Sequence, residues 1–235
     1  MDERRWEQIG GIAGIVSVAL LLPTTFVVAI AGDYPAPDAP ARDVIAYFRD
    51  NETIYEAALF LEAISLGLNA WFFGALRGVL DRGESRGSGL PSIAFGAGLA
   101  FLVTSLVEDA ALVAALRVAV GSGSESGVEA LWTFAFLANW PFGRPVLVVA
   151  LVAAGVSILH SKTLPFRFGA FSLIAAAGNA VFIPTVFVDS GPYVAGGLLA
   201  HIVGSLLFEL WVLTVSLAVI RTSLSARRPA HPRRS

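Results

Sequence analysis

Long apolar runs separated by short polar loops are the feature that most constrains the fold of this chain. The first run extends from about Ile9 to Ala31, and each later run also reaches the roughly 20 residues that a helix needs to cross a bilayer. Because a bilayer offers the backbone no hydrogen-bonding partners, such runs must satisfy their polar groups internally, as helices do. Charged residues make up only 14% of the chain, against about 25% in soluble domains. The sequence therefore predicts an all-α, polytopic membrane helical bundle.

Polar and basic breaks divide the apolar sequence into six predicted transmembrane helices. They form one integral membrane domain over residues 1–222, followed by a basic cytoplasmic tail over residues 223–235. Between the first two spans, Val44, Tyr47 and Phe48 share one helical face, which predicts a short extracytoplasmic helix on the membrane surface with Asp43 as its N-cap. The six spans are expected at about residues 9–31, 53–79, 90–120, 128–161, 168–188 and 193–220.

The stretch 128–161 decides the topology, because as one helix it is about 50 Å long, longer than one crossing but short for two with a turn. As one span, bent near Pro141 and Pro145, it places 12 of the 16 basic residues on one side of the membrane. The positive-inside rule then makes that side cytoplasmic. We therefore predict a multi-pass protein of the cell membrane with a kinked fourth span and both termini in the cytoplasm. The twelve residues are Arg4, Arg5, Arg77, Arg82, Arg86, Lys162, Arg167, Arg221, Arg227, Arg228, Arg233 and Arg234.

Six ionisable side chains lie inside the predicted spans and away from the span ends, where a charge costs a few kcal/mol and usually faces a bundle interior or a wet cavity. At 1.5 Å per residue, four of the six come to a similar depth, slightly outward of the middle of their spans. Asn69 shares a helix face with Glu62, Asn139 lies just above Arg144, and Asn179 is at the middle of the fifth span. One polar chamber that opens outward accounts for these positions. The six ionisable residues are Glu62, Glu108, Asp109, Arg144, His201 and Glu209.

The charges of this set do not balance, because four carboxyl groups face one guanidinium and one imidazole. A purely structural interpretation has Arg144 bridging one or two carboxylates, with the asparagines joining helices by hydrogen bonds. The remaining charge then requires protons, water, a cation or a ligand. Carboxyl groups in a cleft serve proton coupling and acid/base catalysis equally well. The two deeper tryptophans, Trp71 and Trp211, either pack within the bundle or wall the chamber.

The residue inventory argues against several cofactor sites. The chain has no cysteine, which excludes disulfides and thiolate metal sites. Its one lysine, Lys162, lies outside the spans, and this position excludes a retinal Schiff base within the bundle. His160 and His201 lie at opposite depths, which disfavours haem and three-histidine zinc sites. A carboxylate-rich metal site stays open, although no di-iron Glu-x-x-His pair occurs in the spans. We predict no cofactor, no metal ligands and no nucleic-acid partner, with membrane lipid as the expected surroundings and the oligomeric state left open.

Several short motifs give the chain a family resemblance. They are Gly-Ile-Ala-Gly over residues 11–14, Ala-Leu-Arg ending at Arg77, and His-Ser-Lys-Thr-Leu-Pro over residues 160–165 with Gly169 after it. With the exposed helix before the second span, this order of features resembles a family of small bacterial, mainly actinobacterial, multi-spanning membrane proteins of unknown function. The resemblance covers most of the chain and implies no activity.

Two main functions fit these residues. In the first, the outward chamber binds or transports a small amphipathic or cationic ligand, with Glu62, Glu108 and Asp109 as an anionic wall and Arg144 as their clamp. In the second, a membrane-embedded enzyme acts on a lipophilic, polyprenyl or terpenoid-type substrate. Glu62 or Glu209 is then the general acid, a second carboxylate such as Asp109 is the base, and Trp71, Phe72 and Trp211 stabilise cationic character. A third hypothesis is an accessory membrane subunit that buries its charges against a partner.

Overall fold

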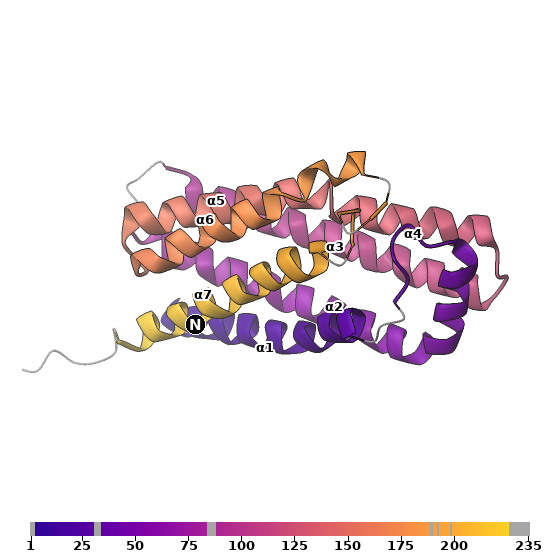
Figure 1. Cartoon of the computed structure of the whole chain (residues 1–235). Helices are drawn as coiled ribbons and strands as arrows, with labels where there is room; N and C mark the ends of the chain where they lie inside the picture. The colour runs from indigo at the N-terminus through magenta and orange to yellow at the C-terminus, as the bar shows by residue number, and fades with distance from the viewer. Residues whose placement is uncertain are drawn as a thin grey trace, which may run out of the picture.

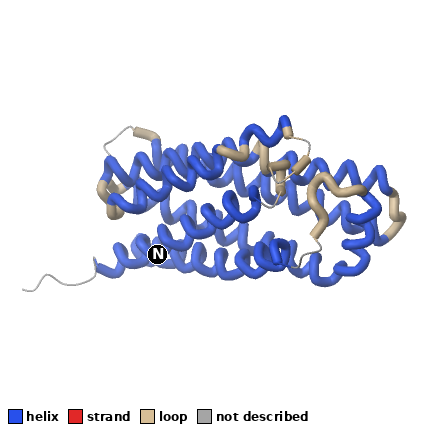
Figure 2. The backbone as a smooth tube through the Cα atoms, in the orientation of Figure 1, coloured by secondary structure: helices blue, strands red, loops and turns tan. Residues whose placement is uncertain are grey.

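The computed structural model describes residues 3–30, 34–83, 88–188, 190–191, 193–197 and 199–225, with the side chains of residues 3, 24–30, 201 and 225 left aside. All regular secondary structure in these ranges is helical, and the long helices lie side by side in an elongated bundle (Figures 1 and 2). The elements are α1 (Glu3–Ile30), α2 (Ala41–Asp81), α3 (Leu90–Val120), α4 (Glu125–Asn139), α5 (Gly143–Ser161), α6 (Phe166–Ala180), the 3₁₀ turn η1 (Ile183–Phe187), the π-helical turn η2 (Ala200–Ser205) and α7 (Leu206–Ser225).

Six segments within the described residues are long and apolar enough to cross a membrane. Several of them are apolar around the whole helix, as expected where one face meets lipid and the other meets neighbouring helices. The prediction of a six-span membrane helical bundle is confirmed at this level. The segments are Arg4–Pro23, Ala41–Asp81, Leu90–Val120, Glu125–Ser161, Phe166–Phe187 and Ile202–Leu224.

The expected short helix before the second span is the first part of α2, which bends at Asn51 (φ −123°, ψ 16°). Asn51 Nδ2 donates to the Tyr47 carbonyl at 2.9 Å, so its side chain satisfies a backbone group of the preceding turn at the bend. In Figure 1 this first part crosses the end of the bundle. The prediction that Asp43 is the N-cap is wrong: the helix begins at Ala41 after Pro40, whose fixed φ of −55° suits a helix start, and Asp43 lies in the first turn.

The fourth span is bent as predicted, and the bend is a complete break between two helices. α4 ends at Asn139 and α5 begins at Gly143, with Trp140, Pro141 and Phe142 forming a turn. A proline lacks the backbone N–H that would continue the helix, so Pro141 ends the ladder of hydrogen bonds. The break sets Asn139, Trp140 and Arg144 beside one another at one depth in the bundle.

The start of the sixth span differs from the prediction. Residues 193–197 form turns, and helix resumes only near residue 199, first with the wider π-helical hydrogen bonding of η2 and then as α7. Gly196 explains part of the difference, because its φ of 73° is left-handed and a Cβ at this position would collide with the Phe136 ring. The fifth span is also interrupted, since α6 ends at Ala180 and Pro184 lies in the 3₁₀ turn η1.

Antiparallel helices pack closely toward the end of the bundle where Arg82 and Lys162 lie. A Cβ at Gly10 of α1 would collide with Ala75 of α2, and one at Gly155 of α5 would come within 3.0 Å of Ser172 of α6. The buried Glu7 side chain pairs with Arg82 at the end where α2 and α5 finish and α3 begins. We call this the basic end.

Two apolar cores fill the bundle, with polar side chains between them. The core nearer the basic end includes Leu66 of α2, Leu102 of α3 and Leu147 of α5. The other core includes Leu59 of α2 and Ala111 of α3, together with residues of the first part of α2 and of α4. Residues 62, 105, 108, 109 and 144 fall between these limits on their own helices, so a polar layer crosses the bundle at one depth.

Candidate functional site

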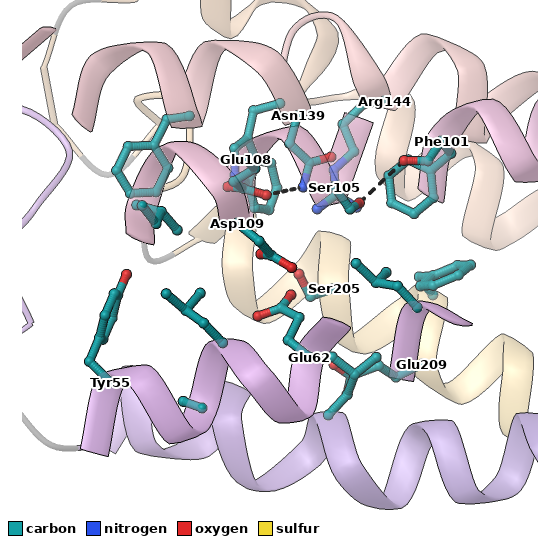
Figure 3. Close-up of a pocket in the computed structure, with 18 of the residues that line it drawn as sticks. Tyr55, Glu62, Phe101, Ser105, Glu108, Asp109, Asn139, Arg144, Ser205 and Glu209 are labelled. Atoms are coloured by element: carbon teal, nitrogen blue, oxygen red, sulfur yellow. Dashed lines mark hydrogen bonds between the residues drawn. The ribbon is translucent and has the colours of Figure 1, made fainter. Parts of the chain in front are cut away.

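A cavity of about 110 Å³ occupies the polar layer between the two cores. Figure 3 shows it between two groups of helices, with side chains entering from both. The volume suffices for several water molecules or a small organic group, because one water needs about 10–15 Å³ measured in this way. We call it the polar cavity. Its lining residues are Leu21, Tyr34, Tyr55, Ala58, Leu59, Glu62, Leu66, Phe101, Ser105, Glu108, Asp109, Leu112, Phe136, Asn139, Trp140, Arg144, Ser205, Phe208 and Glu209.

Helical periodicity explains which residues of α2 and α3 enter the cavity. On α2 they occur at positions 55, 58, 59, 62 and 66, and on α3 at positions 101, 105, 108, 109 and 112. Both sets have the spacing of three and four residues that keeps side chains on one face of a helix. Each stripe carries acidic groups at its centre and apolar or aromatic groups at its ends.

The structure brings all four predicted carboxyl residues, Glu62, Glu108, Asp109 and Glu209, to this cavity. In Figure 3 the carboxyl groups of Glu62 and Asp109 point toward one another, with Ser205 beside them. Glu62 and Glu209 also lie near enough to repel one another when both are ionised. The cavity is therefore strongly acidic, and its acidic groups come from α2, α3 and α7.

Glu108 and Arg144 have neutral amide partners. Glu108 accepts a hydrogen bond from Asn139 Nδ2, which joins α3 to α4. Arg144 donates from Nη1 to Asn179 Oδ1 at 2.8 Å, and its guanidinium lies over the Trp140 ring at 3.9 Å from the centroid. No ion pair joins Arg144 to a carboxylate within the described part of the chain. Arg144 thus bonds to α6 and lies over an aromatic ring, and it is near enough to Glu108 for their opposite charges to attract.

Three polar atoms that border the cavity have no hydrogen-bond partner within the described protein. They are Asp109 Oδ2, Asn139 Oδ1 and Arg144 Nε, and each belongs to a side chain that is no more than 7% exposed. Buried polar groups in native proteins are nearly always satisfied by protein, ordered water or a ligand. These three atoms therefore call for a partner inside the cavity, either ordered water or a ligand.

Aromatic side chains enclose the end of the polar cavity away from the basic end. The Tyr34 and Tyr55 hydroxyls lie 3.3 Å apart, and the Tyr34 ring also packs against Trp132 of α4. Burial raises the pKa of Tyr34, which lies in the loop before α2, well above its ordinary value, so its hydroxyl stays neutral. Tyr34 has no periodic signal in the sequence, because a loop carries it to the site. Tyr55 could have been found, since it lies seven residues before Glu62 on the same helix face.

The other residues proposed from the sequence lie away from the cavity or outside the described side chains. Asn69 is fully buried seven residues below Glu62, and neither of its side-chain polar atoms has a described partner. Trp211 is also fully buried, donates to Ser172 Oγ at 2.7 Å and packs among phenylalanines. Trp71 is 46% exposed and stacks on Trp6, so it walls no part of the cavity. The side chain of His201 lies outside the described residues.

Two further tryptophans, Trp140 and Trp132, are both buried near the polar cavity. Trp140 is 1% exposed, lines the polar cavity and supports Arg144, while Trp132 is 2% exposed and packs on Tyr34. Across the residues that the structure describes, no three His, Cys, Asp or Glu side chains gather closely enough to hold a metal ion.

The comparisons with known proteins give no match. No family model, curated protein or solved structure is detectably similar to this chain. The function must therefore be argued from the site itself.

Proposed function

We propose that this protein binds a small organic cation in the polar cavity, as a membrane receptor or carrier for such a ligand. One observation carries the proposal: four carboxyl residues converge on a cavity whose one guanidinium is already held by Asn179. A positively charged guest offsets the mutual repulsion of four carboxyl groups that line one cavity together with a single guanidinium.

The chemistry of the walls favours an organic cation with apolar substituents. Phe101, Phe136, Phe208 and the two tyrosines line the cavity together with leucines, so most directions around a guest offer aromatic or apolar surface. A cation over such rings is attracted by about 0.5–2 kcal/mol for each favourable contact. Asp109 Oδ2 and Asn139 Oδ1 supply acceptors for an N–H group or a bound water. Tertiary ammonium compounds combine the charge, the apolar substituents and an N–H donor, and quaternary ammonium compounds combine the charge and the apolar substituents.

The orientation that the positive-inside rule predicts supports access from outside the cell. With the basic end in the cytoplasm, in accord with the positive-inside rule, Asp109 lies 11 residues from the outer end of α3 and 19 from its inner end. The π-helical turn η2 ends at Ser205 and precedes Glu209 on the outer side of the cavity. Such turns recur at functional sites, where they reposition side chains.

The test uses two probes of nearly equal shape and different charge. Benzyltrimethylammonium is a cation, and neopentylbenzene has a neutral carbon in place of its nitrogen. We expect the purified protein in detergent to bind the cation in isothermal titration calorimetry at least tenfold more tightly than neopentylbenzene. The double variant Glu62→Gln with Asp109→Asn should abolish that preference, because it keeps shape and removes charge.

The matched control is Glu129→Gln on the exposed surface of α4, which should bind as the unaltered protein does. Equal affinity for the two probes, or an unchanged preference in the double variant, would overturn the proposal. Native mass spectrometry of the gently purified protein provides a second measurement, since a retained cation should be lost from the double variant.

An acid/base enzyme for a lipophilic substrate is a second candidate, favoured by the facing carboxyl groups of Glu62 and Asp109 in an aromatic cavity (Figure 3). One carboxylic acid protonates an alkene carbon and the other carboxylate removes a proton from a neighbouring carbon, so the net change is an isomerisation. In D₂O this reaction incorporates deuterium into an added polyprenyl alcohol. Incorporation that depends on Glu62 would favour the enzyme, and its absence would favour the binding protein.

A further inference from the structure

A second concavity lies at the basic end, between the end of α5, the loop that follows it and the end of α7. It has a volume of about 690 Å³ and is open to the surroundings. Apolar side chains form most of its wall, and cationic side chains from two different elements stand at it. We call it the basic groove. Its lining residues are Ile158, Leu159, Lys162, Thr163, Leu164, Pro165, Phe166, Arg221 and Thr222.

The charged side chains that line the basic groove are all positive. Lys162 and Arg221 are both exposed, and neither forms an ion pair with any residue that the structure describes. Thr163 and Thr222 add hydroxyl groups to the wall, and no acidic residue lines it. By contrast, three other cations near the helix ends, Arg77, Arg82 and Arg117, each pair with a carboxylate.

The backbone at Lys162 adds a second, independent observation. Lys162 closes α5 in the left-handed conformation, with φ 54° and ψ 20°, where helices usually carry glycine or asparagine. It is the one non-glycine residue with a positive φ in the described ranges. A side chain held in such a conformation against its preference is a recognised mark of a functional position. Here it presents an ammonium group at the groove.

The position of the groove fits a lipid. It lies where two membrane-crossing helices end, which is the depth of the phospholipid headgroups. Phe166, which is 74% exposed, and Leu159 both belong to the apolar wall of the groove, which offers a surface for an acyl chain. A free phosphate would use the cations and leave this apolar wall bare.

We propose that the basic groove binds an anionic phospholipid, with the phosphodiester between Lys162 and Arg221 and an acyl chain along Leu159 and Phe166. Basic pockets between transmembrane helices on the cytoplasmic side are known to take such headgroups. This site is separate from the polar cavity and does not depend on the function proposed for it.

The test is a native mass spectrometry titration of the full chain with dioctanoyl phosphatidylglycerol and with dioctanoyl phosphatidylcholine. The anionic lipid should bind at least tenfold more tightly. Removing one cation, by Lys162→Gln or Arg221→Gln, should weaken it about fivefold, and the double variant should lose the preference. Lys162→Arg should retain the preference, as should the control Arg42→Gln, which removes an exposed cation distant from the groove.

Three outcomes would overturn the proposal. They are equal binding of the two lipids, unchanged lipid preference in the charge-removing variants, and competition by soluble glycerol 3-phosphate as strong as that by the lipid, which would assign the site to free phosphate. Lys162→Gly separates binding from folding, because it removes the charge and relieves the left-handed backbone. A well-folded Lys162→Gly protein must also show the weakened lipid binding.

Discussion

Replacing Asn179 by alanine should destabilise the bundle by about 1–2 kcal/mol, chiefly through the loss of the hydrogen bond that it accepts from Arg144. Asn179 is fully buried in α6 and accepts from Arg144 Nη1 at 2.8 Å. Its own Nδ2 donates to the Ala175 carbonyl at 2.9 Å, which orients the amide oxygen toward Arg144. The hydrogen bond from Arg144 to Asn179 therefore ties the guanidinium to α6.

The size of the effect follows from the surroundings of Arg144. Neutral hydrogen bonds between membrane helices average about 0.6 kcal/mol, and a charged donor roughly doubles this. A buried charge stranded entirely costs about 3–5 kcal/mol, but Arg144 keeps its contact with Trp140 at 3.9 Å. Because that cation–π contact contributes up to about 2 kcal/mol when desolvated, the loss should stay well below the stranded-charge value.

The measurement is reversible unfolding in mixed detergent and SDS micelles, followed by far-ultraviolet circular dichroism. Asn179→Ala, Arg144→Met and the double variant form a mutant cycle, which isolates the energy that the two residues share. We expect a coupling of about 1–2 kcal/mol. Asn179→Asp keeps an acceptor oxygen and should recover most of the stability.

Additive effects of the two substitutions, to within about 0.5 kcal/mol, would refute the reasoning. That result would mean that Arg144 draws its stabilisation elsewhere, for example from the carboxylates of the polar cavity. A loss of about 3–5 kcal/mol in Asn179→Ala would equally refute it, because the aromatic contact would then contribute nothing.

Three further predictions concern the packing and the surface. Gly10→Ala should destabilise the protein by about 1–3 kcal/mol in the same unfolding assay, because the added methyl collides with Ala75, whereas Gly67→Ala, with open space around it, should be neutral or stabilising. Arg117→Gln removes surface ion pairs to α2 and should cost less than about 1 kcal/mol, an effect that 0.5 M salt should remove. Lys162→Gly should raise the stability by up to about 1 kcal/mol, measured by thermal unfolding, because glycine adopts the left-handed backbone without strain.

Sequence periodicity predicted the parts of this structure that belong to single helices. Six spans follow from the length of the apolar runs, and the bend of the fourth follows from its prolines. Counting residues along each span also placed Glu62, Asp109 and Arg144 at one depth, and they meet at the polar cavity. Depth and helix face are local properties, fixed by a rise of 1.5 Å and by 3.6 residues per turn.

Contacts between helices were beyond the reach of the sequence. Trp71 and Trp211 both lie within apolar runs, yet one is 46% exposed and the other is fully buried. In a soluble helix the buried face is apolar and the opposite face is polar, so the sequence pattern identifies the buried face. A membrane helix is apolar on both faces, so its pattern does not identify the face that meets lipid. Only packing decided that side.

The partners of the polar groups were decided in the same way. From the sequence, Arg144 could have met any carboxylate at its depth, but the rotation of α5 against α6 gives it Asn179 and places its guanidinium over Trp140. Tyr34 reaches the polar cavity from a loop, where no periodicity applies. The sequence by itself determined the helices and the depth of each charge, and the tertiary structure chose the contacts, because rotation and crossing of helices are set by packing over the whole bundle.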